Sequence, residues 1–422
     1  MKNSMKILVM GSGGREHAIA WRLAACESVE TIYAAPGNPG IARVAECLSP
    51  GGSTPDHYLN LATELGVDLT VVGPEAPLVA GVVDAFRARG LRIVGPTRAA
   101  AQLEGSKVFA KQFMARAGIP TARSVTVDNV EDARKQLGAF GYPVVLKADG
   151  LAAGKGVIIA QSKAEAEQAL GGLLSGTLVG TAGSRVVIEE FLAGEEVSFI
   201  SLCDGKNAVA LLPTQDHKAV FDGDRGPNTG GMGAYCDSRI LDETMTWRIM
   251  DTVVQPTVNC MAAEGAPFTG FLYAGLMMTA DGPKVLEFNV RLGDPETQPI
   301  MLRMQGDFAA VLAGEAAPAW TSDPSVCVVL AAAGYPGKPR AGDVISGIEE
   351  AEAGGATVFQ AGTRMGTSGL ETSGGRVLGV TAPGATLQQA IAKAYAAVGH
   401  IHFEGAHYRN DIGAKGLKRW AD

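Results

Sequence analysis

The chain has little of what marks a membrane, secreted or nucleic-acid-binding protein. No apolar run is long enough to span a bilayer, and the N-terminus lacks the charged start, apolar core and cleavage site of a signal peptide. We therefore expect a soluble, cytoplasmic protein with no membrane partner. The formal net charge is −8 and there is no basic tract, which argues against a nucleic-acid partner while leaving small anionic substrates open.

Cysteine is also scarce, and its placement excludes two further classes. None of the six cysteines forms a Cys-x-x-Cys pair, which argues against both zinc ribbons and disulfide frameworks. We expect them to be small core residues. They are Cys26, Cys47, Cys203, Cys236, Cys260 and Cys327.

At 422 residues, 46% of them hydrophobic and 19% charged, the chain is long enough for two to four compact units. The first hundred residues alternate apolar runs with helical patterns, which predicts a doubly wound α/β module that ends near Gly95-Pro96. Its expected strands cover 6–10, 31–34, 69–72 and 92–94, and its first helix covers 15–25.

The glycine turn at residues 11–14 suggests a dinucleotide fold, but two features disfavour it. Glu16 replaces the third glycine of G-x-G-x-x-G, and the second strand runs into residues 35–39 without an acidic residue for a ribose. The turn and the Gly37-Asn38 corner could still bind a monophosphate through backbone N–H groups. Plain turn chemistry is an equal alternative for both.

Residues 144–157 contain two lysines and join an apolar β-branched run to a second glycine-rich turn directly after it. Lys147 ends the expected strand, and the glycines let backbone N–H groups approach anionic oxygens. It is not a Walker loop, because three residues separate Gly150 from Gly154 and no Ser or Thr follows Lys155. The pattern indicates a nucleotide phosphate site, although a lysine-bearing surface hairpin would look the same locally.

Further strands are expected at 157–160 and 185–191, the second of which ends in adjacent carboxylates, Glu189 and Glu190. Paired acids at a sheet edge are usually just solvated. Beside a phosphate loop, a glutamate can instead bind the exocyclic amine of adenine or the ribose hydroxyls.

A metal signal lies in residues 284–291. Side chains alternate along a strand, so Glu287, Asn289 and Arg291 are expected to share one face. Carboxylate and amide oxygens suit magnesium held jointly with nucleotide phosphates, and an arginine suits an anionic reactant. An exposed strand face without a ligand is the alternative.

The glycine-rich stretch at 228–233 and the polar cluster at 215–218 add to these signals. Together they predict a flexible lid and candidate substrate groups. His217 is expected to be structural and without an acid–base role.

Taken together, these motifs resemble the ATP-grasp superfamily and, within it, the phosphoribosylamine–glycine ligase family. The resemblance runs in one order along essentially the whole chain, and this collinearity makes accident very unlikely. The matching stretches are GSGGREHA (11–18), APGNPG (35–40), VVGPEAPL (71–78), AAQLEGSK (100–107), LKADGLAAGKGV (146–157), IEEFLAGEE (188–196), QDHK (215–218), GPNTGGMGAY (226–235), LEFNVRLGDPETQ (286–298), GGRVL (374–378) and YRNDIG (408–413).

The resemblance implies an ATP-grasp fold of mixed α/β and α+β class. Its domains would be an N-terminal Rossmann-like, sugar-phosphate-binding domain over 1–103, an ATP-grasp domain over 104–325 with a lid subdomain at about 121–190, and a small C-terminal α+β domain over 326–422. The implied oligomeric state is a monomer or weak dimer.

The implied reaction belongs to purine biosynthesis. ATP phosphorylates the carboxylate of glycine, and the amine of 5-phosphoribosylamine attacks the glycyl phosphate to give glycinamide ribonucleotide, ADP and phosphate. Such chemistry needs charge stabilisation and alignment more than a protein base. ATP would be a substrate, and Mg²⁺ or Mn²⁺ the cofactor.

The resemblance also implies roles for individual residues. Those expected to bind ATP are Lys107, Lys147, Gly154, Lys155, Gly156, Glu189, Glu190, Phe191, Leu192 and Glu196. Those expected to bind the other substrates are Gly11, Gly13, Gly14, Gly37, Asn38, Gly73, Pro74, Glu75, Asp216 and Arg291, of which Asp216 and Arg291 would be catalytic. Glu287 and Asn289 would bind the metal.

Three positions depart from the family pattern. Ala219 stands where an arginine usually follows QDHK, Gln360 replaces the histidine of a His-Ala-Gly-Thr run, and Asn410 replaces the lysine of YRKDIG. None is an expected metal or phosphate ligand, although loss of the arginine at 219 could weaken a substrate contact.

Other classes remain as alternatives. Another ATP-grasp carboxylate–amine ligase would keep the central motifs but would not be expected to match GSGGREHA and APGNPG. A nicotinamide dehydrogenase rests only on the glycine cluster, and a catalytically dead scaffold would be expected to lose Lys147, Glu287 or Asn289.

Overall fold

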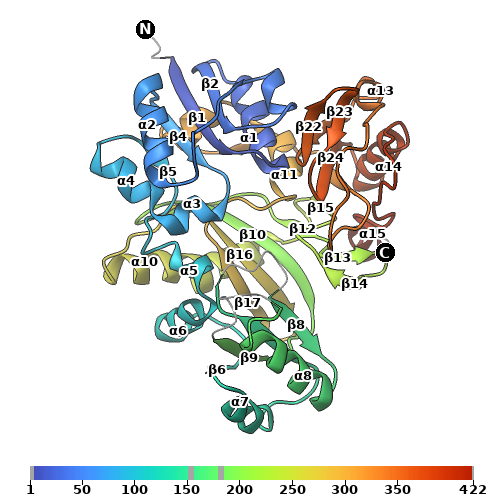
Figure 1. The fold of residues 1–422 in the computed structure, drawn as a ribbon. Helices are drawn as coiled ribbons and strands as arrows, with labels where there is room; N and C mark the ends of the chain where they lie inside the picture. The colour runs from blue at the N-terminus through green and yellow to red at the C-terminus, as the bar shows by residue number, and fades with distance from the viewer. Residues whose placement is uncertain (1–3, 151–155, 179–184, 421–422) are drawn as a thin grey trace. The chain divides into compact units, whose positions relative to one another are not determined.

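A computed structural model describes residues 4–150, 156–178 and 185–420. The chain divides into two compact units, each assembled from segments that are distant in sequence (Figure 1). Unit 1 contains Met1–Gly95, Leu211–Asp242 and Arg291–Asp422, and unit 2 contains Pro96–Ala210 and Glu243–Val290.

Unit 1 begins with a parallel five-stranded sheet of order β3-β2-β1-β4-β5. Strand β1 is almost wholly apolar and buried, as expected of a parallel strand covered on both faces. The strand order reverses between β1 and β4, and the carboxyl edge at such a reversal is where open parallel sheets bind ligands. The elements are β1 (Met5–Gly11), β2 (Val29–Pro36), β3 (Glu46–Cys47), β4 (Leu69–Val72) and β5 (Ile93–Val94), with α1 (Gly14–Ala24), α2 (Pro55–Leu65), α3 (Glu75–Ala80) and α4 (Val82–Ala88).

The rest of unit 1 is built on antiparallel strands in the order β12-β15-β20-β24-β21. These are β12 (Thr214–Asp216), β15 (Gly233–Cys236), β20 (Ser325–Ala331), β24 (Arg376–Pro383) and β21 (Thr357–Gln360). Three two-stranded pairs accompany them: β13 (Ala219–Phe221) with β14 (Arg225–Asn228), β18 (Met304–Gln305) with β19 (Ala319–Trp320), and β22 (Thr363–Gly366) with β23 (Gly369–Thr372). The helices are α11 (Thr297–Arg303), α12 (Phe308–Leu312), α13 (Ile348–Ala353), α14 (Leu387–Val398) and α15 (Ala414–Arg419).

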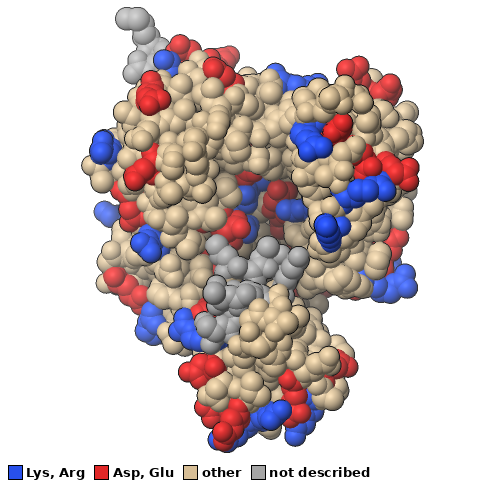
Figure 2. Space-filling view, in the orientation of Figure 1, with Lys and Arg blue, Asp and Glu red and all other residues tan. Residues whose placement is uncertain are grey.

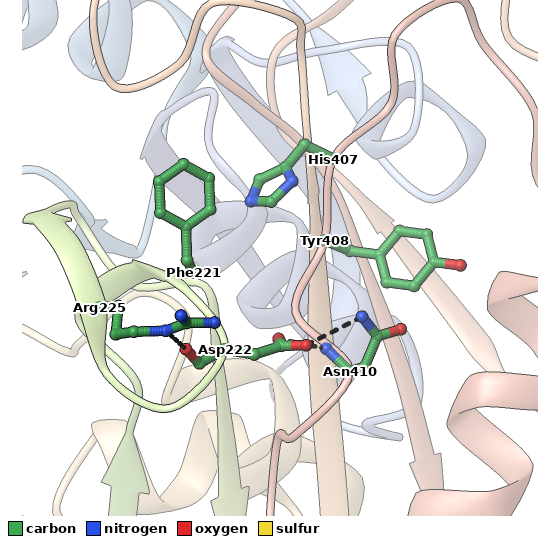
Figure 3. Close-up of a pocket in the computed structure, with 6 residues that line it drawn as sticks. All are labelled: Phe221, Asp222, Arg225, His407, Tyr408 and Asn410. Carbon is green, nitrogen blue, oxygen red and sulfur yellow. Dashed lines mark hydrogen bonds between the residues drawn. The ribbon is translucent and has the colours of Figure 1, made fainter.

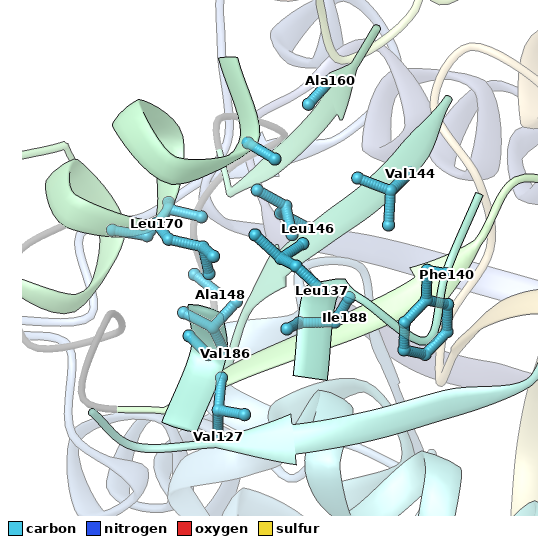
Figure 4. Close-up of a cluster of buried hydrophobic side chains, with 13 residues drawn as sticks. Val127, Leu137, Phe140, Val144, Leu146, Ala148, Ala160, Leu170, Val186 and Ile188 are labelled. Carbon is cyan, nitrogen blue, oxygen red and sulfur yellow. The ribbon is translucent and has the colours of Figure 1, made fainter. Parts of the chain in front are cut away.

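Unit 2 contains an antiparallel sheet of order β6-β9-β7-β8, formed by β6 (Ser124–Val127), β7 (Val144–Ala148), β8 (Val157–Ala160) and β9 (Val186–Glu190). Helices α7 (Val130–Leu137) and α8 (Lys163–Leu174) pack on this sheet. Their apolar faces meet alternate strand residues in a closed core that includes Leu146, Leu170 and Ile188 (Figure 4). This core makes β7 and β9 rigid carriers for Lys147 and Glu189.

The second sheet of unit 2 pairs β10 (Glu195–Asp204) with β16 (Thr269–Thr279), and β16 with β17 (Gly282–Asn289). The short strand β11 (Ala208–Ala210) pairs with β10. The helices are α5 (Gln102–Gly105), α6 (Lys107–Ala117), α9 (Glu243–Ile249) and α10 (Gln255–Ala263), with a π-helical turn, η3 (Met250–Val254), between the last two.

The expected mixed α/β class is confirmed, with a parallel N-terminal module followed by antiparallel sheets. Four of the six cysteines are buried, as expected, while Cys47 and Cys260 are half-buried. No helix among the described residues is long and apolar enough to cross a membrane. The face in Figure 2 intersperses acidic and basic side chains.

Candidate active site

The glycine turn after β1 is shaped around the carboxylate of Glu16. Glu16 is 2% exposed, and its Oε2 accepts a 2.5 Å hydrogen bond from the N–H of Gly13, which caps α1. A Cβ would lie 2.7 Å from the Glu16 side chain if added at Gly11, 2.8 Å if added at Gly13 and 2.0 Å if added at Gly73. In the sequence, Glu16 was noted only because it replaces the third glycine of G-x-G-x-x-G. In the structure, its side chain fills the space that a Cβ would need in the loops after β1 and β4, so these loops require glycine.

Arg15 ties this turn to the segment after Arg291. Its Nε donates to Glu16 at 2.5 Å, and its Nη1 donates to the Leu292 carbonyl at 3.0 Å. Gly14 is equally confined, because a Cβ there would lie 2.7 Å from Gln298 Nε2. Arg15 belongs to the GSGGREHA motif, but no local signal assigned it a role.

The Gly37-Asn38 corner is held by internal hydrogen bonds. The Gly37 N–H donates to the Gly11 carbonyl at 3.1 Å, and its role in binding a sugar phosphate stays a prediction. Asn38 Nδ2 donates to the carbonyls of Ser12 and Gln360, each at 2.8 Å, and its Oδ1 accepts from the Ile41 N–H. The Asn38 side chain therefore fixes the corner, and Gln360, one of the family departures, takes part through its backbone.

Glu75, just after β4, forms an ion pair with Arg291. Pro74 caps α3, which begins at Glu75, and Glu75 Oε2 lies 3.6 Å from Arg291 Nε. Burial alone would raise the pKa of Glu75, but the charge of Arg291 lowers it below its ordinary value. Arg291 lies beyond the end of β17, so strand alternation does not place it on one face with Glu287 and Asn289, as the sequence predicted.

Asp216 is 9% exposed at the end of β12, and the neighbouring His217 is 1% exposed. Burial, with the charge of Arg409, lowers the pKa of His217 to about 4, so its imidazole is neutral at pH 7. That His217 has no acid–base role stays a prediction.

The glycine loop at 228–233 is anchored along its backbone. The Thr229 N–H donates to the Lys218 carbonyl at 2.7 Å, and the Gly230 N–H donates to Tyr335 Oη at 3.0 Å. Arg376 Nη1 donates to the Gly230 carbonyl at 2.6 Å. These bonds hold the loop in the arrangement described here, and its role as a flexible lid stays a prediction.

Two of the three departures from the family pattern lie at the β13–β14 hairpin: Ala219 begins β13, and Asn410 contacts Asp222 between the two strands. Arg409 is fully buried, and its Nη1 donates to the Ala219 carbonyl at 3.1 Å and to Asp224 Oδ1 at 3.0 Å. The Asn410 backbone and side chain both donate to the Asp222 carboxylate, at the floor of a cavity of about 420 Å³ (Figure 3). Asn410 thus contributes to hairpin anchoring without a charge.

In unit 2, Lys107 and Lys147 of the expected ATP set lie beside β17. Lys107 begins α6, and its Nζ is 3.6 Å from Glu287 Oε2. Lys147 is 5% exposed in β7, and its Nζ donates to the Leu286 carbonyl at 2.8 Å. Both lysines are therefore held beside the strand that carries the expected metal residues.

Asp149, which sequence analysis did not select, supports the start of α6. Its Oδ1 accepts from Ser106 Oγ at 2.8 Å and from the Val108 N–H at 3.2 Å. The sequence signal that could have identified Asp149 is its position directly after β7, the strand that carries Lys147. Of the glycine-loop residues, Gly154 and Lys155 lie outside the described part of the chain, while the Gly156 carbonyl accepts from the Ala148 N–H at 2.8 Å.

Glu287 and Asn289 occupy alternate positions of β17, opposite Gly275 and Tyr273 of β16. Phe288 between them is 1% exposed in the core, so the expected alternation holds for this pair. The described residues contain no group of three His, Cys, Asp or Glu side chains that would enclose a metal by themselves. One carboxylate and one amide oxygen nevertheless fit Mg²⁺ that takes its remaining ligands from phosphate and water.

The expected adenine and ribose residues divide by burial. Glu189 is 2% exposed, and its Oε2 lies 3.0 Å from Lys147 Nζ, which excludes the reading of a solvated edge acid. Glu190 Oε1 accepts from the Arg123 N–H at 2.9 Å, and Leu192 packs in a small apolar cluster with Ala122, Met277 and Leu286. Phe191 is 41% exposed, and Glu196 lies on β10 opposite Met277.

Comparisons with known proteins agree with this arrangement. The chain matches the phosphoribosylglycinamide synthetase N domain over residues 5–104, the ATP-grasp (A) domain over 105–297 and the C domain over 325–415. It is 52% identical to a phosphoribosylamine–glycine ligase of Ralstonia nicotianae over 98% of this chain and 100% of the relative. It is 50% identical to the Escherichia coli phosphoribosylamine–glycine ligase over 98% of this chain and 99% of the relative.

Among solved structures, phosphoribosylamine–glycine ligase from Thermotoga maritima superposes with a TM-score of 0.85 at 37% identity, covering 96% of this chain and 100% of the other. A biotin carboxylase from Campylobacter jejuni superposes with a TM-score of 0.73 at 15% identity, covering 99% of this chain and 96% of the other, a likeness of fold alone.

Proposed function

Since the chain belongs to the phosphoribosylglycinamide synthetase family, we propose that it ligates glycine to 5-phosphoribosylamine at the expense of ATP. The products are glycinamide ribonucleotide, ADP and phosphate, and the intermediate is glycyl phosphate. The observation that carries this proposal is full-length similarity at about half identity to ligases of that name, combined with retention of Lys147, Glu287 and Asn289.

Lys107 and Lys147 bind ATP phosphates in this proposal, together with the loop that contains Gly154, Lys155 and Gly156. Lys147 suits this role because a rigid strand fixes its ammonium group, so little reorganisation is needed when charge moves during transfer. Glu189, Glu190, Phe191, Leu192 and Glu196 bind the adenine and ribose.

Glu287 and Asn289 would hold Mg²⁺ or Mn²⁺, and the fit of their hard oxygen atoms supports that assignment. When bound, the metal neutralises charge on the phosphoryl group in transfer and on ADP. Lys107, 3.6 Å from Glu287, adds a cation next to the same carboxylate.

Arg291 and Asp216 orient the reacting glycine. Arg291 binds the carboxylate of glycine, and Asp216 binds its amine. The loops of unit 1 receive the phosphorylated sugar through Gly11, Gly13, Gly14, Gly73, Pro74 and Glu75. Gly37 and Asn38, at the corner after β2, belong to the same substrate-binding set. The charge on Glu75, stabilised by Arg291, suits an acceptor for ribose hydroxyls or the amine.

We propose three functional domains, over 1–103, 104–325 and 326–422, with a lid subdomain at about 121–190. The boundaries of the compact units differ from these, because residues 211–242 and 291–325 of the proposed ATP-grasp domain belong to unit 1. We further propose a cytoplasmic protein that is a monomer or weak dimer and takes only small-molecule substrates.

The decisive assay measures ADP release with glycine, magnesium and phosphoribosylamine generated in situ, omitting each component in turn. ADP should form at the full rate only with all of them present, together with glycinamide ribonucleotide. Full-rate ADP release without phosphoribosylamine, or with another amine in its place, would favour a different ATP-grasp carboxylate–amine ligase.

A further inference from the structure

A third buried charge, Lys111, lies beside Lys147 and Glu189. Lys111 belongs to α6, is 7% exposed, and places its Nζ 3.2 Å from Glu189 Oε2. Lys147 Nζ approaches the same oxygen at 3.0 Å. Glu189 Oε1 is buried and has no hydrogen-bond partner among the described residues. Two ammonium groups therefore hold one carboxylate oxygen and leave the other as an acceptor.

The two lysines differ in how many of their donors are used. An ammonium group has three N–H donors. Those of Lys111 are taken by Thr121 Oγ1 at 2.8 Å, the Ala122 carbonyl at 3.2 Å and Glu189. The described contacts of Lys147 are two, to the Leu286 carbonyl and to Glu189. Lys147 thus keeps a donor for a phosphate oxygen, whereas Lys111 is fully committed to the protein.

Both lysines also connect Glu189 to strand β17. The Thr121 hydroxyl that accepts from Lys111 donates to the Val285 carbonyl at 2.6 Å, and Lys147 donates to the next carbonyl, that of Leu286. Glu287 follows directly on the same strand. The network therefore sets the position of Glu189 relative to the residues proposed to hold metal and phosphate.

We infer that Lys111 is a positioning residue for nucleotide recognition: it fixes Glu189 so that Oε1 accepts a donor from the base, and it leaves Lys147 available to the phosphates. The inference rests on the proposed ATP assignment of Glu189 and Lys147. Because an exocyclic amine donates and a ring carbonyl does not, Oε1 held in place distinguishes adenine from hypoxanthine.

The test compares the binding of ATP and ITP, whose base carries an oxygen in place of the amine. We expect wild-type protein to prefer ATP, and Lys111→Met to reduce the ATP-to-ITP affinity ratio by about tenfold. The KM for glycine should change less than about twofold, because the contacts of Lys111 are to Thr121, Ala122 and Glu189, none of which is assigned to glycine. Thr121→Val, which removes only the hydroxyl that holds Lys111, should shift the ratio in the same direction and less, and it keeps the test valid if Lys111→Met does not fold.

Two controls separate positioning from general damage. Arg116→Met removes an exposed ion pair with Glu264 from the same helix and should leave the ratio unchanged. In a Glu189→Gln background, Lys111→Met should produce no further change in the ratio, because its effect passes through Glu189.

An equal loss of ATP and ITP binding in folded Lys111→Met, or the same change with and without Glu189, would overturn the inference. So would a wild-type protein that binds the two nucleotides alike. Since nucleotide binding is measured without the ligation reaction, a protein that prefers ATP but makes no glycinamide ribonucleotide would refute only the proposed function.

Discussion

Replacing Gly37 by alanine should distort the proposed sugar-phosphate site without affecting the nucleotide residues. Gly37 has φ +71°, a conformation that L side chains rarely adopt, and a Cβ there would lie 2.3 Å from Cys47 Sγ and 3.1 Å from Cys47 Cβ. Its N–H also donates to the Gly11 carbonyl. A shift at Gly37 is therefore transmitted to the glycine turn after β1.

The loss of stability in Gly37→Ala has two parts, the cost of the backbone conformation and the overlap with Cys47. Other residues of this chain allow the two to be measured separately. Gly66 also has a positive φ, +63°, but no atom lies within 4 Å of an added Cβ. Gly66→Ala should therefore lower the free energy of unfolding by about 1 kcal/mol, the cost of the backbone conformation alone. Gly37→Ala adds the overlap with Cys47, about 1–3 kcal/mol more.

Cys47→Ala tests the second part directly, because it removes Sγ and leaves only the 3.1 Å contact with Cβ. The double variant Gly37→Ala, Cys47→Ala should recover about 1–2 kcal/mol of the loss seen in Gly37→Ala. Chemical denaturation of the four variants and the wild type gives these differences.

Activity provides the functional side of the same experiment. Gly37→Ala should raise the KM for phosphoribosylamine several-fold, while the KM for ATP stays within about twofold, because the residues assigned to ATP belong to unit 2. Equal destabilisation by Gly37→Ala and Gly66→Ala would refute the steric reasoning. A matching rise in the KM for ATP would refute the separate sugar-phosphate site.

Three further predictions test the metal, the intermediate and the buried histidines. Glu287→Gln should lower turnover by about a hundredfold or more, with partial recovery at high magnesium, and unchanged ADP release at ordinary magnesium would end the assignment. Glycine labelled with oxygen-18 in its carboxylate should pass one labelled oxygen to the released phosphate, and unlabelled phosphate alongside product would eliminate the acyl phosphate. Burial lowers the pKa of His17 and of His217 to about 4, from 6.5, so the unfolded chain binds more protons between these values. The free energy of unfolding should therefore fall as pH drops from 6.5 to 4, by up to about 1.4 kcal/mol per pH unit for each histidine. His17→Gln and His217→Gln should each reduce this slope, and a slope as steep as that of the wild type in both variants would contradict the reasoning.

The local elements and the chemistry-bearing motifs could be predicted from the sequence. Strand β4 has the predicted bounds 69–72, and Glu287 and Asn289 alternate with core residues as predicted. These features depend on neighbouring residues, because apolar periodicity and glycine or proline punctuation act within a few positions of the chain. The collinear motifs also identified the family, which the comparisons confirmed.

Only the tertiary structure decided how the motif residues are held. Asn38 bonds to Gln360 across 322 positions, Lys147 to the Leu286 carbonyl across 139, and Arg376 to the Gly230 carbonyl across 146. Such contacts add three facts that the sequence did not show: the Gly37 N–H is paired, the loop at 228–233 is hydrogen-bonded along its backbone, and Glu189 is buried between two lysines. These contacts depend on which strand ends the topology brings together, and the spacing of residues along the chain does not show which distant segments become neighbours.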